Sequence, residues 1–263
     1  MSKGHPYYSK VRNKNRLYSA WRRVYENGIN SKSEETRNQI KDFSAVALKE
    51  INRIADQLYK NKFRFAPALG IPQKRAGKKP RPIVKSPIPN RIVQRSILDV
   101  LQEDPAIRQY VFVPTSFGGI ETRGVTSAVR ASYDAMQNGA TWYIRSDIEG
   151  FFRQIPRGKV LQMISDKIPD LFFNELLTAA VTTELENLDE LGKNAELFPL
   201  YEIGVAQGCC LSPLIGNILL HDFDVRMNED DISGEDVRDV LTNESIIEKT
   251  YSSTISTHSM LLS

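Results

Sequence analysis

The chain has 263 residues, 41% apolar and 25% charged, which is the balance of a globular protein with a sizeable core. Its two cysteines, Cys209 and Cys210, are adjacent, which excludes a disulfide framework and predicts a reducing compartment, the cytoplasm. The three histidines are scattered, so no zinc cluster is visible; the basic N-terminus is unlike a signal peptide, and no apolar run reaches the roughly 18 residues of a membrane helix.

The net charge of +3 conceals an uneven distribution. Residues 1–100 contain 23 Lys and Arg against 7 Asp and Glu, whereas residues 101–263 contain 12 against 25. A block this basic predicts a polyanionic partner, such as nucleic acid, held by the first part of the chain. The alternative is that these charges are solvated helix faces.

Hydrophobic spacing predicts helices in the N-terminal part. The first, 13–28, has one apolar face, formed by Leu17, Ala20, Trp21, Val24 and Tyr25. A second begins near Ser33, and its apolar residues recur at spacings of three and four: Ile40, Phe43, Ala47, Ile51, Ile54 and Leu58. Both stripes indicate core packing.

Residues 63–89 are rich in Pro, Gly and basic residues between short β-prone pieces, which predicts a hairpin with a basic tip. Further helices are predicted over 90–103, 125–137, 158–168, 171–186 and 213–227. We expect a loop over 111–124, a strand over 141–147 and a short strand pair within 199–205. After residue 227 the chain carries eight acids against two bases, which indicates a tail with little fold of its own.

Three stretches carry candidate chemistry, and the first is GIPQKRAGKKPRPIV, residues 70–84. A hairpin tip with Lys74, Lys79 and Arg81 can direct several donors at one polyphosphate, because Arg grips phosphate oxygens in a fork and Lys acts as a point charge. Alternatively, it is an ordinary exposed charged loop.

The second stretch is IRSDIEGFF, in which Asp147 ends a predicted strand. A carboxylate there can bind Mg²⁺, which prefers oxygen ligands, and the backbone carbonyl of Ile148 can assist. Phe152 can form one wall of a nucleotide site. In the alternative interpretation Asp147 caps a turn and the phenylalanines fill the core.

The third stretch is GVAQGCCLSPLIGNILL, in which Gln207-Gly208 and Ser212-Pro213 bracket a loop before a helix. Gly208 permits close approach of another backbone or a base. Ser212 and Pro213 are typical of a helix start, with Ser212 as its cap. A plain entry into a helix explains Ser-Pro but leaves Gln-Gly unexplained.

The order RPIV, NRIVQ, SFGGIETRG, RSDIEGFF and AQGCCLSPLIGN resembles the bacterial reverse transcriptases, which include group II intron, retron and phage-defence types. The resemblance runs from about residue 63 to 227, and its wording is nearest to the defence types. It implies an α+β right-hand polymerase, with N-terminal basic helices over 1–62, fingers over 63–138, a partial palm over 139–233, and an atypical tail over 234–263.

The resemblance also implies roles for single residues. Lys74 and Arg81 would bind the triphosphate, and Asp147 with the Ile148 carbonyl would hold Mg²⁺ in a two-ion centre. The remaining nucleotide-site residues are Phe152, as the gate against a 2′-hydroxyl, and Gln207 and Gly208, whereas Ala206 departs from the usual proline. Contacts to nucleic acid are expected from Lys78, Lys79, Arg91, Ser212 and Pro213. The expected partners are an RNA template, a DNA or RNA primer and dNTPs.

One required element has no match. Two-metal phosphoryl transfer needs a second carboxylate, which these enzymes supply from a Tyr-x-Asp-Asp hairpin. Glu229-Asp230-Asp231 comes too soon after the last helix, and Asp222 and Asp224 point to different helix faces. The thumb is also missing, so the sequence predicts an incomplete polymerase, out of frame from about Gly234. The other reading frames downstream of Ser233 test this.

Two other functions remain. The basic part can hold RNA without catalysis, through phosphate contacts and through stacking of Tyr7, Tyr8, Tyr18 and Trp21. The third hypothesis is a basic helical protein that matches the reverse-transcriptase motifs by chance. The occurrence of three motifs in the right order argues against it.

Overall fold

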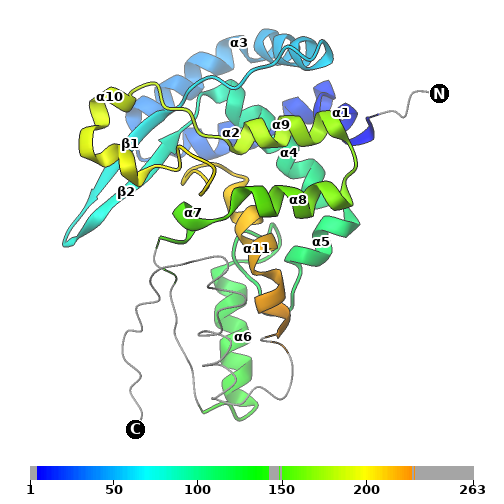
Figure 1. The fold of residues 1–263 in the computed structure, drawn as a ribbon, viewed down its shortest axis with the longest axis vertical. Coiled ribbons are helices and arrows are strands. Elements are labelled where there is room, and N and C mark those ends of the chain that lie inside the picture. Colours follow the sequence, from blue (N-terminus) through cyan, green and yellow to red (C-terminus); the bar gives the residue numbers. More distant parts are fainter. Residues whose placement is uncertain (1–4, 142–147, 149, 227, 229–263) are drawn as a thin grey trace.

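The computed structural model describes residues 5–141, 148, 150–226 and 228, and it is rich in helix with one small sheet (Figure 1). The helices are α1 (Pro6–Val11), α2 (Lys14–Ile29), α3 (Glu34–Tyr59), α4 (Ile88–Glu103), α5 (Pro105–Val111), α6 (Val125–Gln137), α7 (Phe151–Gln154), α8 (Arg157–Lys167), α9 (Leu171–Val181), α10 (Leu188–Leu191) and α11 (Ser212–Arg226). A 3-10 helix covers Gly192–Leu197, and strands β1 (Leu69–Arg75) and β2 (Lys78–Lys85) pair antiparallel. This mixture agrees with the α+β class.

Helices α2 and α3 form where their stripes and caps predict them. The Asn13 side chain accepts hydrogen bonds from two amides at the start of α2, and the Ser33 side chain accepts one from Thr36. The predicted apolar faces are turned inward, and Leu17, Ile40 and Leu58 are fully buried. The two stripes therefore build core, as predicted.

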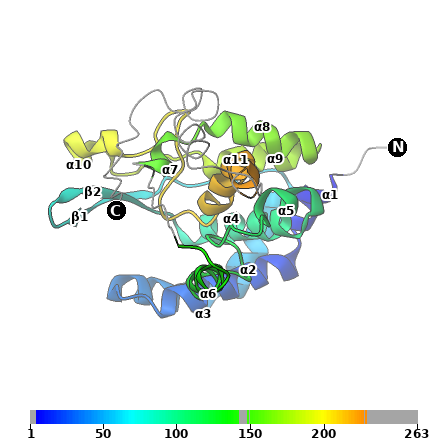
Figure 2. The same ribbon diagram turned by 90° about the horizontal axis from the view of Figure 1, so that it is seen from below.

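Helix α4 is the centre of the fold. Seen from below, it lies between a layer of α2 and α3 and a layer of α8 and α9 (Figure 2). Its apolar residues Ile92, Val93 and Ile97 have no exposed surface. Burying each such side chain stabilises the fold by about 1.5–3 kcal/mol, so α4 is the main anchor of both layers.

Polar side chains of α4 fasten neighbouring segments by hydrogen bonds to their backbones. Asn90 bonds both the amide and the carbonyl of Ala66, just before β1. Gln94 donates to the carbonyl of Ala180 in α9, and Ser96 donates to the carbonyl of Val11 in α1. The polar residues of NRIVQ other than Arg91 therefore hold the scaffold together.

The hairpin is anchored at its base and free at its tip. Gly70 is bracketed by the Asn187 side chain, which accepts from its amide at 2.8 Å and donates to its carbonyl at 3.0 Å. A Cβ at Gly70 would lie 3.0 Å from two leucine side chains, so glycine permits this close packing. The register runs from Leu69 opposite Lys85 to Arg75 opposite Lys78, with an irregularity between Gln73 and Arg75.

The buried carboxylate of Asp170 ties the N-terminal segment to the body of the fold. It accepts hydrogen bonds from the amides of Tyr7 and Tyr8, both at 3.0 Å, and from the amide of Phe173 at 3.1 Å. His5 Nδ1 lies 3.1 Å from it. Because the Asp170 side chain has no exposed surface, these contacts replace all of its hydration.

Several predicted elements need correction. The helix predicted over 171–186 ends at Val181, because Thr182 adopts an extended conformation. The strand pair predicted within 199–205 is wrong: Ile203 makes one isolated bridge, to Pro156. The strand expected over 141–147 and the tail after 228 lie outside the described residues, and the division into fingers and palm stays a prediction.

No helix in the described part of the chain is both long and apolar enough to span a membrane.

Candidate functional site

Strand β2 meets the Gln-Gly loop, which is 126 residues further along the chain. The amide of Val84 donates to the carbonyl of Gln207 at 2.8 Å, and Ile83 forms a parallel bridge with Gln207. Arg81 Nε donates to Gln207 Oε1 at 2.7 Å. Two predicted nucleotide-site residues, Arg81 and Gln207, are therefore in direct contact.

Gly208 makes the close approach that its type suggested. Its φ is +118°, and a Cβ there would lie 2.5 Å from the carbonyl oxygen of Val84. Any larger residue would have to push β2 away and would also be strained in its own backbone. The contact between the hairpin and the loop therefore depends on glycine at this position.

Ser212 and Pro213 serve the scaffold. Ser212 is buried and its hydroxyl donates to the Ala206 carbonyl at 2.7 Å, so it closes the loop on itself. A Cβ at Gly119 would lie 2.5 Å from Cβ of Pro213, so the SFGG loop packs against this proline. Ser212 is the first residue of α11, not the residue before it, and its side chain faces inward. Its contact with nucleic acid stays a prediction.

The paired phenylalanines follow a left-handed glycine, Gly150, with φ +65°. The rings of Phe151 and Phe152 are in an edge contact at 5.4 Å, and both pack partly against the core. The carbonyl of Phe152 accepts from the amide of Val205 at 2.7 Å, which joins α7 to the segment that leads into the Gln-Gly loop. The role of Phe152 as a sugar gate stays a prediction.

The predicted metal ligand Asp147 lies outside the described residues. The carbonyl of Ile148, its predicted companion, accepts from the amide of Phe151 at 3.4 Å. Within the described part of the chain no three His, Cys, Asp or Glu side chains gather as a metal site would need. The two-ion centre therefore stays a prediction from the sequence.

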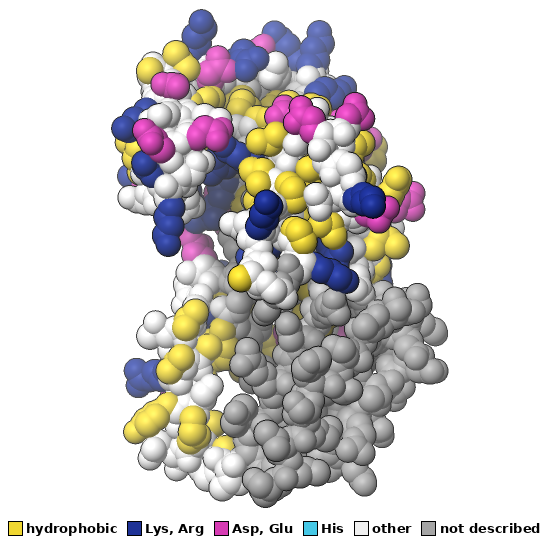
Figure 3. Space-filling model, turned by 90° about the vertical axis from the view of Figure 1, so that its left-hand side faces the viewer, with side chains coloured by type: hydrophobic (Ala, Val, Ile, Leu, Met, Phe, Trp, Pro, Cys, Tyr) yellow, Lys and Arg dark blue, Asp and Glu magenta, His cyan; other side chains and the backbone are white. Residues whose placement is uncertain are grey.

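The hairpin exposes basic side chains. Lys74, Lys79 and Arg81 are exposed, and neither lysine has an ion-pair partner among the described residues. Figure 3 shows the face of the molecule on which the hairpin lies, and Lys and Arg side chains border a recess there. Lys78 lies in β2, but its side chain is outside the described part. The ammonium groups of Lys74 and Lys79 are therefore available to a polyphosphate, whereas Arg81 is held by Gln207.

Arg91 is less accessible than predicted. It is half-buried at the start of α4, and this burial lowers the pKa of its guanidinium, an effect that Cys210 opposes. A role in contacting nucleic acid stays a prediction.

The aromatic platform expected in the N-terminal helices is mostly absent from the described surface. Tyr8 and Trp21 are only 5% and 4% exposed, and the Tyr7 hydroxyl is engaged by Asp104 at 2.8 Å. Tyr18 is 48% exposed. The prediction that Tyr8 and Trp21 stack on bases is wrong, because both rings complete the core.

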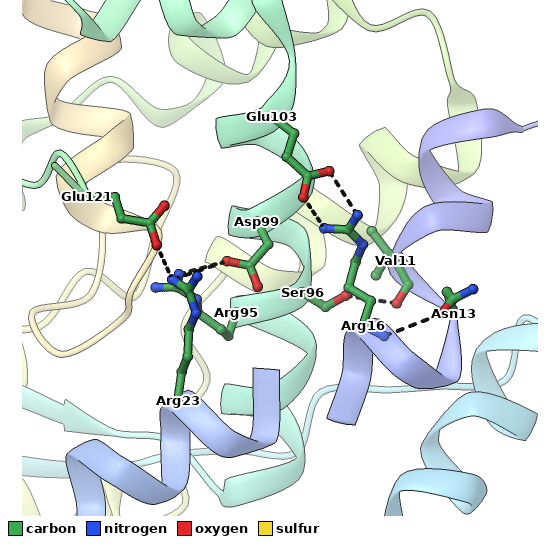
Figure 4. Close-up of polar contacts among 9 residues, drawn as sticks. All are labelled: Val11, Asn13, Arg16, Arg23, Arg95, Ser96, Asp99, Glu103 and Glu121. Carbon is green, nitrogen blue, oxygen red and sulfur yellow. Dashed lines mark hydrogen bonds and ion pairs between the residues drawn. The ribbon is translucent and has the colours of Figure 1, made fainter. Parts of the chain in front are cut away.

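A polar cleft of about 600 Å³, which the sequence did not reveal, lies where α1, α2, α4 and α5 meet the 112–124 loop. Figure 4 shows its ion pairs: Arg16 binds Glu103 through two bonds of 2.8 Å, and Arg23 reaches Glu121 at 2.6 Å. Asp99 lies among them with 13% of its side chain exposed, 2.7 Å from Arg95. These ion pairs join α2 to α4 and to the 112–124 loop, and they engage most of the charged groups that line the cleft.

Burial raises the pKa of Asp99 to about 6, because desolvation outweighs the attraction of Arg23 and Arg16. The folded chain thus holds this proton more tightly than the unfolded chain, whose value is near 3.8. The resulting stabilisation is complete below the unfolded pKa and is lost as the pH rises through about 6.

Asp99→Asn is therefore expected to flatten the dependence of the unfolding free energy on pH between about 4 and 7. At pH 8 the variant should be as stable as the wild type or more stable by about 1 kcal/mol, since a neutral amide is cheaper to bury. Urea unfolding across this pH range measures both effects. Asp56→Asn, an exposed partner of Lys60, is the control and should leave the slope unchanged. Equal slopes in wild type and Asp99→Asn would contradict the assignment.

No family model matches the chain. Over 179 residues it is 30% identical to an uncharacterized 91 kDa protein in a cob intron of Schizosaccharomyces pombe, covering 68% of this chain and 21% of that protein. It is 27% identical over 194 residues to protein YkfC of Escherichia coli, covering 72% and 48%, and 26% identical over 204 residues to the group II intron-encoded protein LtrA of Lactococcus lactis, covering 76% and 32%.

The chain is similar to group II intron-encoded proteins. It spans between about a fifth and a half of the length of these three relatives. The motifs indicated a resemblance to bacterial reverse transcriptases of several types, and this similarity agrees with the group II intron type.

Proposed function

We propose that the chain is the nucleotide-binding part of a reverse transcriptase of the intron-encoded type, which adds deoxynucleotides to a 3′ end under the direction of an RNA template. The hydrogen bond between Arg81 and Gln207 carries this proposal, because it joins two motifs that the sequence assigned to one nucleotide site. The similarity to group II intron-encoded proteins supports it.

The residues divide the work by their chemistry. Arg81 and Lys74, which are exposed, hold the triphosphate, while Gln207, which is bonded to Arg81, and Gly208 lie beside them. Arg81 is already oriented by Gln207, so less conformational freedom is lost when phosphate binds. Asp147 would supply the first carboxylate for Mg²⁺, the ion that neutralises charge on the phosphates in such reactions.

Arg81→Ala is expected to weaken binding of Mg²⁺–dNTP at least tenfold, because a charge-assisted hydrogen bond contributes about 1.5–3 kcal/mol. Titration of the full chain with a fluorescent dNTP measures the dissociation constant. Arg75→Ala is a matched control, since it removes the same charge from the exposed strand before the tip. If both substitutions weaken dNTP binding by the same small factor, the hairpin acts only as a general positive surface.

The second candidate function is RNA binding without catalysis, which the basic balance of residues 1–100 favours. Such binding would weaken steeply with salt and would not depend on Mg²⁺ or on dNTP. The burial of Tyr8 and Trp21 leaves Tyr18 as the one exposed ring of the four that were expected to stack on bases.

Two finer proposals rest on the sequence alone. The wording of SFGGIETRG and VAQGCCLSP favours the defence types, whereas two of the relatives named above are a protein in a cob intron and a group II intron-encoded protein. No Tyr-x-Asp-Asp follows α11, so a second carboxylate for a two-ion centre is still to be assigned.

A further inference from the structure

The only two cysteines of the chain lie side by side in the loop between Gln207-Gly208 and α11. Both are free thiols; Cys209 is buried and Cys210 is partly exposed. Nucleotide binding by guanidinium, ammonium and carboxylate groups makes no use of a thiol. The pair is therefore a reactive feature that the proposed function leaves unexplained.

The pKa values of the two thiols are shifted in opposite directions. A side-chain hydrogen bond with Cys210, and the backbone amides of Leu211 and Ser212, lower the pKa of Cys209 against the effect of burial. The amides matter more than the Ser212 hydroxyl, since its proton is committed to Ala206. The same bond to Cys209, and then burial, raise the pKa of Cys210. The Cys209 thiol therefore loses its proton more readily than the Cys210 thiol.

We propose that Cys209 and Cys210 form a reversible vicinal disulfide on reaction with hydrogen peroxide, and that this oxidation detaches the Gln-Gly loop from β2. The Cys209 thiolate attacks the peroxide oxygen, which gives a sulfenic acid and releases water after protonation. The Cys210 thiol then attacks that sulfur, forms the S–S bond and releases a second water. Two thiols lose two protons and two electrons, which the peroxide takes up.

The short distance between adjacent Cα atoms makes this disulfide easy to reduce and makes it distort the loop backbone. Consecutive Cα atoms are about 3.8 Å apart, whereas disulfides usually join Cα atoms about 4.4–6.8 Å apart. The bond must therefore distort its own backbone, and strained disulfides are the ones that are readily reduced. The thiols cannot pair without moving the loop.

The loop has weak points on both sides of the pair. The amide of Cys209 donates to Ala206 at 3.3 Å and the amide of Ser212 donates to the Cys209 carbonyl at 3.3 Å, both longer than usual. These bonds give way first. Gly208 directly precedes the pair and touches the Val84 carbonyl, so its displacement is transmitted to the contact with β2.

The test uses the full chain, hydrogen peroxide and two independent readouts. Intact mass is expected to fall by about 2 Da with loss of both titratable thiols, and dithiothreitol should restore both. Amide exchange at Val84, whose N–H is bonded to Gln207, is expected to accelerate at least tenfold in the oxidised chain. Retention of both thiols, addition of oxygen without S–S formation, or a disulfide between two chains would overturn the proposal.

Single-cysteine variants identify the attacking sulfur. With dimedone as a trap for sulfenic acid, Cys210→Ala, which keeps Cys209, should be labelled several-fold faster than Cys209→Ala. The preference should vanish in urea, where both thiols are alike. Equal labelling in the folded chains would contradict the assigned order. None of these readouts involves a nucleotide, so they can fail while dNTP binding succeeds, and the reverse.

Discussion

Asp147→Ala is expected to lower Mg²⁺-dependent primer extension by about 1000-fold or more, because a metal ligand contributes several kcal/mol to stabilising the charge that develops on phosphate. The measurement is single-turnover extension of a primer on an RNA template. Asp166→Ala, which removes an exposed carboxylate of α8, is the control and should extend as the wild type does.

Extension that survives in Asp147→Ala would contradict the role of this residue. Where the chain does not extend a primer, the same two variants are compared for the Mg²⁺ dependence of dNTP binding. The expected result is that Mg²⁺ strengthens binding to wild type and Asp166→Ala but not to Asp147→Ala. Salt-sensitive RNA binding that ignores Mg²⁺ and both substitutions would favour the non-catalytic function.

Asp170→Ala is expected to lower the free energy of unfolding by about 3–5 kcal/mol, which is the scale for removing one partner of a buried charged contact. The change leaves the buried amides of Tyr8 and Phe173, and the partly buried amide of Tyr7, without their acceptor. Urea unfolding monitored by tryptophan fluorescence gives the value.

Asp166→Ala serves again as the control, since its exposed carboxylate contacts only Gln162 among the described residues. It should change stability by less than about 0.5 kcal/mol. A loss below about 1 kcal/mol in Asp170→Ala would show that water replaces the carboxylate and that α1 is not held by it.

Sequence periodicity was sufficient for elements with long apolar stripes. Helices α2 and α3 were predicted because Ser33 and the stripe from Ile40 to Leu58 are local signals. Four short helices, α1, α5, α7 and α10, were missed because four to seven residues show no period. A signal for α5 was present: Asp104 before Pro105 is a capping residue before a first-turn proline, and its carboxylate accepts from two amides.

The candidate site was predicted as an order of motifs, not as an arrangement. The resemblance to reverse transcriptases assigned Arg81, Gln207 and Gly208 to one site, and the structure brings these three together. The inward turn of Ser212 was not predictable, because a serine at a helix start caps outward or bonds inward depending on what packs above it. The polar cleft around Asp99 could not be predicted from the sequence either. Its residues come from separate elements, which only tertiary packing brings together.

The most direct test of a single nucleotide site built from the hairpin and the Gln-Gly loop is hydrogen exchange of the full chain with and without Mg²⁺–dNTP. We predict that peptides covering 69–85 and 204–212 become protected together, at nucleotide concentrations that follow one binding curve. Protection of either segment alone, or protection confined to the polar cleft between α2 and α4, would contradict the account.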